Sequence, residues 1–268
     1  MHRVIVIGSV NHDRIWHLEN SLRPGGRLRF STRETHLGGG GFHTGRQLLD
    51  LGADVALVTG LMRDEQGLAA MDTLDRMGFD TRHVAMRPGD TMPLEILLEP
   101  SGERTILAPS DRRHVALSIN EALKGDAAYL NVLLLEEPLV AKLDDIPLVV
   151  SQLPLGPATP RPADYIVTSR DDADEEPAGV WRRAVDLAGS RLKMLVLTDG
   201  PRSITLYDGV RSIQVEPAQA VRGVSTIGAG DRFSGAFLFS LLSGRDAATA
   251  AAEASQIIAD WLRGQLPR

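Results

Sequence analysis

The 268-residue sequence contains no cysteine, few aromatic residues (4%) and no long apolar run. The absence of cysteine excludes disulfides, thiolate zinc sites and thiol catalysis, and it suits a reducing cytoplasm, where we expect the protein to be located. No stretch reaches the roughly 18 apolar residues that a membrane helix needs. The N-terminus lacks the apolar core and cleavage site of a signal peptide. We therefore expect no membrane partner.

The sequence also lacks a basic run, and its net charge is −6. Proteins that bind polyanions usually carry a clustered basic face, so nucleic acid is not an expected partner. The seven histidines are scattered, without a metal-binding frame such as H-E-x-x-H. Hydrophobic residues make up 43% of the chain, an ordinary share for a globular protein long enough to bury a ligand cleft.

Short apolar, β-branched runs alternate with helical patterns along the chain. Most of the runs are nearly continuous, which is typical of strands buried on both faces. The runs cover residues 4–7, 55–59, 132–135, 148–150, 165–168 and 194–198. The helical patterns between and after them cover 67–77, 181–187, 231–242 and 247–262. This alternation predicts an α/β fold with a doubly wound, mostly parallel sheet, which we expect to form a single domain over residues 1–268.

Two segments break this pattern. Residues 27–37 alternate apolar and polar side chains, and residues 93–109 hold two extended pieces around Ser101 and Gly102. Alternation indicates a strand with one solvated face, so these strands should lie outside the main sheet. They fit either a small β lid, formed by inserted segments at about 14–37 and 91–109, or an ordinary pair of surface hairpins. The pattern alone does not separate the two.

The strongest chemical signal is the segment Gly228-Ala229-Gly230-Asp231, directly before a helical run. Unpaired backbone N–H groups and the positive end of the helix dipole make such a helix start a binding site for phosphate. Asp231 would then lie beside a transferring phosphoryl group. The alternative is a glycine turn in which Asp231 only caps the helix. A G-x-G-x-x-G dinucleotide fingerprint is excluded because Phe233 stands where its third glycine is needed.

Two further signals are weaker. Residues 40–47 nearly spell a Walker A loop, but Arg46 and Gln47 replace its lysine and its hydroxyl residue, which excludes a P-loop. Asn11 and Asp13 follow the first predicted strand, at the carboxyl end where open α/β sheets bind their ligands. Asp13 could accept hydrogen bonds from two hydroxyls of a sugar, or both residues could simply cap a turn.

The order of these segments resembles the ribokinase-like (PfkB) family of carbohydrate and nucleoside kinases over nearly the whole chain. The segments that carry the resemblance are GSVNHD (8–13), the glycine run 38–41, LGADV (51–55), GERT (102–105), LEEP (135–138), LTDG (197–200) and GAGD (228–231). The resemblance implies a ribokinase-like fold with a β lid. It also implies ATP-dependent transfer of a phosphoryl group to a hydroxyl of a sugar, sugar acid or nucleoside.

The resemblance also implies a role for individual residues. Asp231 would take the proton from the acceptor hydroxyl, beside an anion hole formed by Gly228, Ala229 and Gly230. The acceptor would be bound by Asn11, Asp13, Gly38, Gly39, His43 and Glu136. ATP would lie along Ser169, Thr198, Gly200 and Ser255, with Mg²⁺ near Asp172. Family members often pair through their β lids, so a homodimer is an expected assembly.

Several positions depart from the family pattern. Ser225-Thr226 stands where relatives have Asp-Thr, so the resemblance does not carry a monovalent-cation site over to this chain. Residues 169–172 (SRDD) replace the Asn-x-x-Glu element, Gly40 replaces a frequent lysine, and His43 replaces the usual asparagine. The identity of the acceptor therefore does not follow. These departures leave a second hypothesis, a kinase-fold ligand-binding or sensor protein with little activity.

Overall fold

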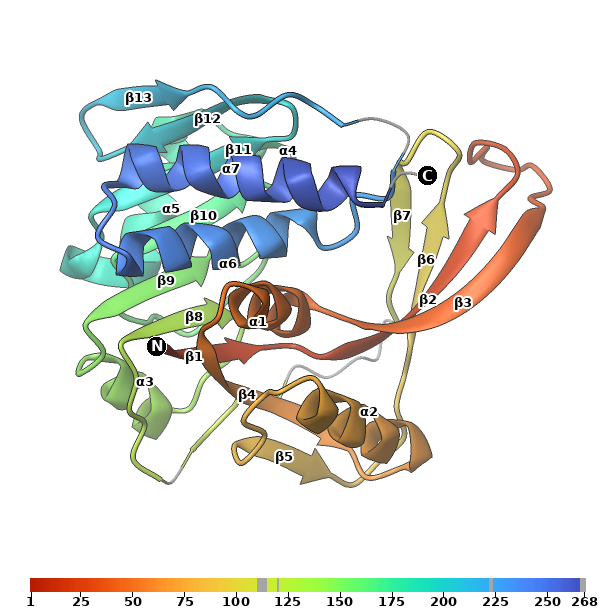
Figure 1. Cartoon of the computed structure of the whole chain (residues 1–268), viewed down its shortest axis with the longest axis horizontal. Helices are drawn as coiled ribbons and strands as arrows, with labels where there is room; N and C mark the ends of the chain where they lie inside the picture. The colour runs from red at the N-terminus through yellow and green to blue at the C-terminus, as the bar shows by residue number, and fades with distance from the viewer. Residues whose placement is uncertain (110–114, 120, 222–223, 266–268) are drawn as a thin grey trace.

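The computed structural model describes residues 1–109, 115–119, 121–221 and 224–265. Its main sheet contains β1 (Arg3–Gly8), β4 (Asp54–Met62), β5 (Val84–Arg87), β8 (Ala127–Asn131), β9 (Leu148–Gln152), β10 (Tyr165–Ser169), β11 (Met194–Asp199), β12 (Arg202–Tyr207) and β13 (Ser212–Val215). The strand order is β13-β12-β11-β10-β9-β8-β1-β4-β5 (Figure 1). Neighbours from β5 to β11 pair in parallel, and β12 and β13 extend the sheet antiparallel.

Helices cover both faces of this sheet. The helices are α1 (Gly40–Asp50), α2 (Glu65–Arg76), α3 (Glu137–Leu143), α4 (Arg170–Ala173), α5 (Pro177–Ala188), α6 (Ala229–Leu242) and α7 (Ala247–Arg263). Successive side chains of a strand point to opposite faces. On β1, Val4 and Val6 accordingly belong to the apolar cluster that contains α1, α2, α6 and α7, whereas Ile5 and Ile7 belong to the cluster that contains α3 and α5. The predicted doubly wound α/β fold is confirmed.

A second sheet lies outside this core. It contains β2 (Asn11–Leu18), β3 (Phe30–Gly38), β6 (Leu94–Leu98) and β7 (Arg104–Leu107), in the order β3-β2-β6-β7. Figure 1 shows it at the right-hand end of the molecule, beyond the carboxyl end of β1. The alternating segments thus form strands outside the main sheet, as expected. The buried side chains of Ile15, Ile96 and Leu98 form a small cluster on this sheet, and Ile227 packs against it.

One predicted strand is wrong. Residues 132–135 were expected to form a strand, but the strand is β8, which ends at Asn131. The carbonyl oxygens of Val132 and Leu133 instead accept hydrogen bonds of 2.6 Å from the buried guanidinium group of Arg161. This side chain supplies the donors that a neighbouring strand would otherwise provide. In the described part of the chain, no helix combines the length and apolarity needed to span a membrane.

Candidate active site

The candidate residues gather where the carboxyl ends of the parallel strands face the second sheet. Helix α1 approaches this edge closely, because a Cβ atom on Gly8 would lie 2.4 Å from the Cα atom of Gly41. The amides of Gly41 and Phe42 donate to the carbonyl of Ser9, at 3.0 and 3.3 Å. Glycine at both contact positions therefore brings the start of α1 against the end of β1.

Asp231 lies half-buried in the first turn of α6. Its Oδ1 atom accepts a hydrogen bond of 3.0 Å from the side-chain amide of Asn131, the last residue of β8. Its backbone carbonyl accepts one of 2.9 Å from the hydroxyl of the buried Thr44 on α1. Asp231 is thus positioned by contacts from two different elements, of which the one from β8 reaches its carboxyl group.

The surroundings of Asp231 disfavour its charge. Desolvation is the main cause that raises its pKa to about 6, and the negative charges of Asp13 and Asp172 act in the same direction. The positive charge of Arg104 and the hydrogen bond from Asn131 lower it. A pKa near 6 suits a general base, which should titrate close to the working pH. A carboxyl group perturbed by burial and by specific charges is also typical of a functional site.

The start of α6 offers backbone donors beside this carboxyl group. Gly228 is the N-cap residue with φ of 75°, a left-handed conformation that favours glycine. The amide of Ala229 donates to the carbonyl of Thr226 at 3.0 Å. Among the described residues, the amides of Gly228, Gly230 and Asp231 donate to no protein acceptor. A Cβ atom on Gly230 would have no described atom within 4 Å, so this backbone borders open space.

His43 packs beneath this helix start. A Cβ atom on Gly228 would lie 2.6 Å from the imidazole ring, so His43 supports the N-cap of α6. Burial is the main cause that lowers the pKa of His43 to about 4, and the charge of Arg232 adds to this effect. The ring is therefore neutral near pH 7, and it neither repels nor attracts an anion by a net charge.

The residues expected to bind the acceptor lie on β2 and at the junction of β3 with α1. Asn11 pairs with Gly38 in the β2–β3 ladder, and the buried Asp13 lies two residues further along β2. A Cβ atom on Gly38 would lie 1.8 Å from an oxygen of Asp13. Gly39 has φ of 91° and also approaches Asn11. The structure brings these four residues together, and the charge of Asp13 reaches Asp231.

The described contacts of Glu136 do not connect it to this group. It is the exposed N-cap residue of α3, and its backbone amide donates to the carbonyl of Leu117 at 2.9 Å. No described hydrogen bond or ion pair of its side chain joins it to Asn11, Asp13 or Asp231.

The residues expected along the nucleotide lie at the ends of β10 and β11 and on α7. Ser169 and Thr198 are register partners at these strand ends. The hydroxyl of Ser169 accepts a hydrogen bond of 3.1 Å from the amide of the exposed Asp172, which makes it the cap of α4. Gly200 has φ of 53° in the turn after β11. Ser255 on α7 accepts a hydrogen bond of 2.8 Å from the amide of Ala218.

The described residues contain no group of three or more His, Asp or Glu side chains that could hold a metal ion by themselves. This donor set fits Mg²⁺ delivered with a nucleotide, because Mg²⁺ usually takes most of its ligands from phosphates and water and only one or two from carboxylates. Asp172 is the carboxylate expected near Mg²⁺, and its charge acts on Asp231.

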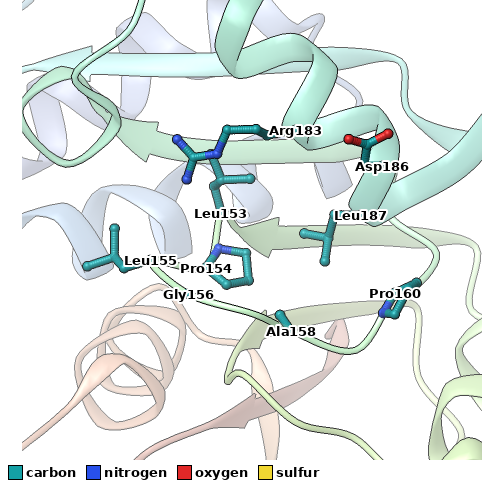
Figure 2. Close-up of a pocket in the computed structure, with 9 residues that line it drawn as sticks. All are labelled: Leu153, Pro154, Leu155, Gly156, Ala158, Pro160, Arg183, Asp186 and Leu187. Carbon is teal, nitrogen blue, oxygen red and sulfur yellow. The ribbon is translucent and has the colours of Figure 1, made fainter.

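A cavity of about 390 Å³ lies elsewhere, between α5 and the loop after β9. Figure 2 shows Arg183 and Asp186 on one side of it and Leu155 on the other. None of the candidate residues lines this cavity. We therefore base the site on the contacts around Asp231.

Sequence reasoning missed three residues that bear on Asp231, namely Asn131, Thr44 and Arg104. A signal for Asn131 was present, since it is a polar residue directly after an apolar strand, as Asn11 is. The predicted strand at 132–135 excluded this residue, because β8 spans Ala127–Asn131. Thr44 and Arg104 had no local signal, because their positions depend on how α1 and the second sheet pack.

The chain is similar to known proteins in sequence and in fold. Residues 162–259 match the model of the pfkB family of carbohydrate kinases. The chain is 23% identical over 261 residues to a ribokinase of Haemophilus influenzae, a match that covers 88% of this chain and 84% of that protein. These matches confirm the resemblance predicted from the sequence.

Two solved structures share the fold. The nucleoside kinase of Burkholderia thailandensis in complex with inosine has a TM-score of 0.73 at 20% identity, covering 98% of this chain and 92% of that chain. The ribokinase of Arabidopsis thaliana complexed with ribose and ATP has a TM-score of 0.73 at 17% identity, covering 98% and 93%. The arrangement of a large, mostly parallel sheet with a second small sheet is thus a ribokinase-like fold.

Proposed function

We propose that this chain, a ribokinase-like kinase of the PfkB type, transfers the γ-phosphate of ATP to a hydroxyl group of a sugar, sugar acid or nucleoside. The observation that carries the proposal is the juxtaposition at the start of α6. The carboxyl group of the half-buried Asp231 lies there beside three backbone amides that no described acceptor engages. Phosphoryl transfer depends mainly on positioning and on stabilisation of charge, and this arrangement supplies both.

In this mechanism Asp231 is the general base. Its ionised carboxylate accepts the proton of the acceptor hydroxyl as the oxygen attacks the γ-phosphorus, and the bond to the β-phosphate oxygen breaks. The amides of Gly228, Gly230 and Asp231 donate to the transferring phosphoryl group, as expected at a helix N-terminus. The amide of Ala229 would not donate to the phosphoryl group, because it already donates to the carbonyl of Thr226.

The two ligands would approach Asp231 from different sides. The relatives solved with ribose and ATP, or with inosine, support a polyhydroxy acceptor and ATP as donor. Asn11, Asp13, Gly38 and Gly39 would bind acceptor hydroxyls, since a buried carboxylate is a strong hydrogen-bond acceptor. ATP would lie along Ser169, Thr198 and Gly200 towards α7. Mg²⁺, held by the phosphates and by Asp172, would neutralise phosphate charge.

A screen of sugars, sugar acids and nucleosides with Mg-ATP tests this proposal. We expect the wild-type protein to consume ATP with at least one acceptor and to form its phosphate ester. Asp231→Asn should lower kcat by about 10²–10⁴-fold, the usual contribution of a positioned base, while ATP binding is retained. Asp145→Asn is the matched control. Asp145 is an exposed aspartate just after the C-terminal end of α3, and its replacement should leave kcat unchanged.

The second hypothesis, a sensor with little activity, predicts a different outcome. Its support is that the Ser169 hydroxyl is already engaged as the cap of α4. Under this hypothesis a ligand raises the melting temperature, but no acceptor in the panel consumes ATP. Undiminished turnover of Asp231→Asn would instead remove Asp231 from the mechanism while leaving kinase activity in place.

A further inference from the structure

Asn131, the residue on β8 that contacts Asp231, is held in place by the main sheet. Asn131 is the last residue of β8, and its backbone pairs in parallel register with Gly8 of β1. Its side chain is held at the carboxyl edge, where the Nδ2 atom lies 3.0 Å from Oδ1 of Asp231. A donor mounted on the central strands of a sheet is more rigidly placed than one on a loop.

Gly40 on α1 leaves room for this amide. A Cβ atom on Gly40 would lie 1.9 Å from Nδ2 of Asn131 and 2.5 Å from its Cγ, so the amide would have to move to admit a side chain here. Gly40 has an ordinary negative φ, so its backbone conformation does not call for glycine. Glycine at this position therefore leaves the Asn131 amide where it reaches Asp231.

The Asn131 amide also acts on the charge of Asp231. Two carboxylates, Asp13 and Asp172, oppose ionisation of Asp231, and burial adds to their effect. The counteracting groups are Arg104, on the exposed strand β7, and Asn131. Asn131 is the one of these two that makes a direct hydrogen bond to the carboxyl group in the described structure.

We propose that Asn131 is a positioning residue for Asp231, that its amide holds the carboxylate in the ionised, proton-accepting form, and that Gly40 is glycine to admit this amide. This inference rests on the proposed kinase function. Asn131 donates from the end of β8 to one carboxyl oxygen of Asp231 and leaves the other oxygen to face the acceptor hydroxyl. Asn131 itself exchanges no proton with the acceptor.

Asn131→Leu tests the proposal, because leucine has a similar volume and no donor. We expect kcat to fall by about 10–100-fold, since a hydrogen bond to a charged group is lost. The KM for ATP should stay unchanged. The acid limb of log(kcat/KM) against pH should move up by about 1–2 pH units. A residue with a purely structural role would lower activity without moving this limb. Asn20→Leu, at an exposed position, is the matched control.

Two further variants separate the amide from the space it occupies. Asn131→Asp keeps the shape of the side chain but replaces the donor by a negative charge. It should therefore move the acid limb of log(kcat/KM) to higher pH than Asn131→Leu does. It also serves if Asn131→Leu fails to fold. Gly40→Ala should displace the intact amide and shift the limb in the same direction. Adding Asn131→Ala to Gly40→Ala should cause no further shift.

A titration without substrate distinguishes failure of this inference from failure of the proposed function. The carboxyl ¹³C signal of Asp231 can be followed against pH in the wild type and in Asn131→Leu. We expect a higher pKa in the variant, whether or not any acceptor is phosphorylated. An unchanged titration, or an acid limb within about 0.2 pH units of the wild type, would overturn the positioning role.

Discussion

Replacing Asp231 by asparagine should stabilise the folded protein at neutral pH while it removes activity. The carboxyl pKa is raised from 3.8 to about 6, mainly by desolvation. A raised carboxyl pKa means that the folded state binds the proton more tightly than the unfolded state does. The ionised group therefore lowers the free energy of unfolding at every pH above both values. Asparagine has nearly the same shape and carries no charge, so it avoids this cost.

The magnitude follows from the size of the pKa shift. A shift of about two units corresponds to roughly 3 kcal/mol, at about 1.36 kcal/mol per unit. Because Asp231 as a residue keeps some exposure to solvent, which screens part of this effect, we expect Asp231→Asn to gain about 1–3 kcal/mol at pH 8. The gain should shrink as the pH falls from 6 towards 4, where Asp231 of the wild type becomes protonated. A stability gain at the expense of activity is a common property of functional residues.

Urea denaturation of the wild type and of Asp231→Asn, at several pH values between 4.5 and 8, measures this difference. Asp145→Asn again serves as control, because an exposed carboxylate should give no pH-dependent gain. If the variant were less stable than the wild type at pH 8, or if its gain were the same at pH 4.5, then desolvation would not be the cause of the shift.

Three other substitutions have expected costs that urea denaturation can measure. Gly228→Ala should cost about 1–2 kcal/mol for its left-handed backbone, more with the clash against His43, and should abolish phosphoryl transfer; a folded variant of full activity would contradict this. Arg161→Met should cost about 1–3 kcal/mol, because it leaves two half-buried carbonyl groups without these donors. Arg232→Leu should cost about 1–3 kcal/mol, because it removes the ring contact with Trp261 at 4.6 Å and the hydrogen bond to Gln47 at 3.1 Å; a neutral effect of either arginine replacement would contradict these expected costs.

Much of the fold could be predicted because the core strands are nearly continuous apolar runs. Val4–Ile7 is fully buried on both sides, so its sequence reports burial directly. The failure at residues 132–135 has a physical cause as well. Those residues are as apolar as a strand, but Arg161, distant in sequence, satisfies their carbonyl groups. Only the three-dimensional structure reveals that partner.

The candidate site could be predicted where one segment supplies both backbone and side chain. The segment 228–231 combines glycines, a helix start and a carboxylate, and all three are local in sequence. The sequence could not reveal which amides are engaged, since the bond from Ala229 to Thr226 depends on the geometry of the turn. Nor could it pair Asn131 with Asp231, because 100 residues separate them.

The central claim is that the start of α6 binds the terminal phosphate of ATP beside Asp231. Amide ¹H–¹⁵N spectra of the protein with and without a non-hydrolysable Mg-ATP analogue test it most directly, with Mg-ADP as the reference that lacks the γ-phosphate. We predict that the amides of Gly228, Gly230 and Asp231 shift strongly with the triphosphate analogue and much less with Mg-ADP. Equal shifts with both nucleotides, or no shift at these amides while the nucleotide binds, would contradict the account.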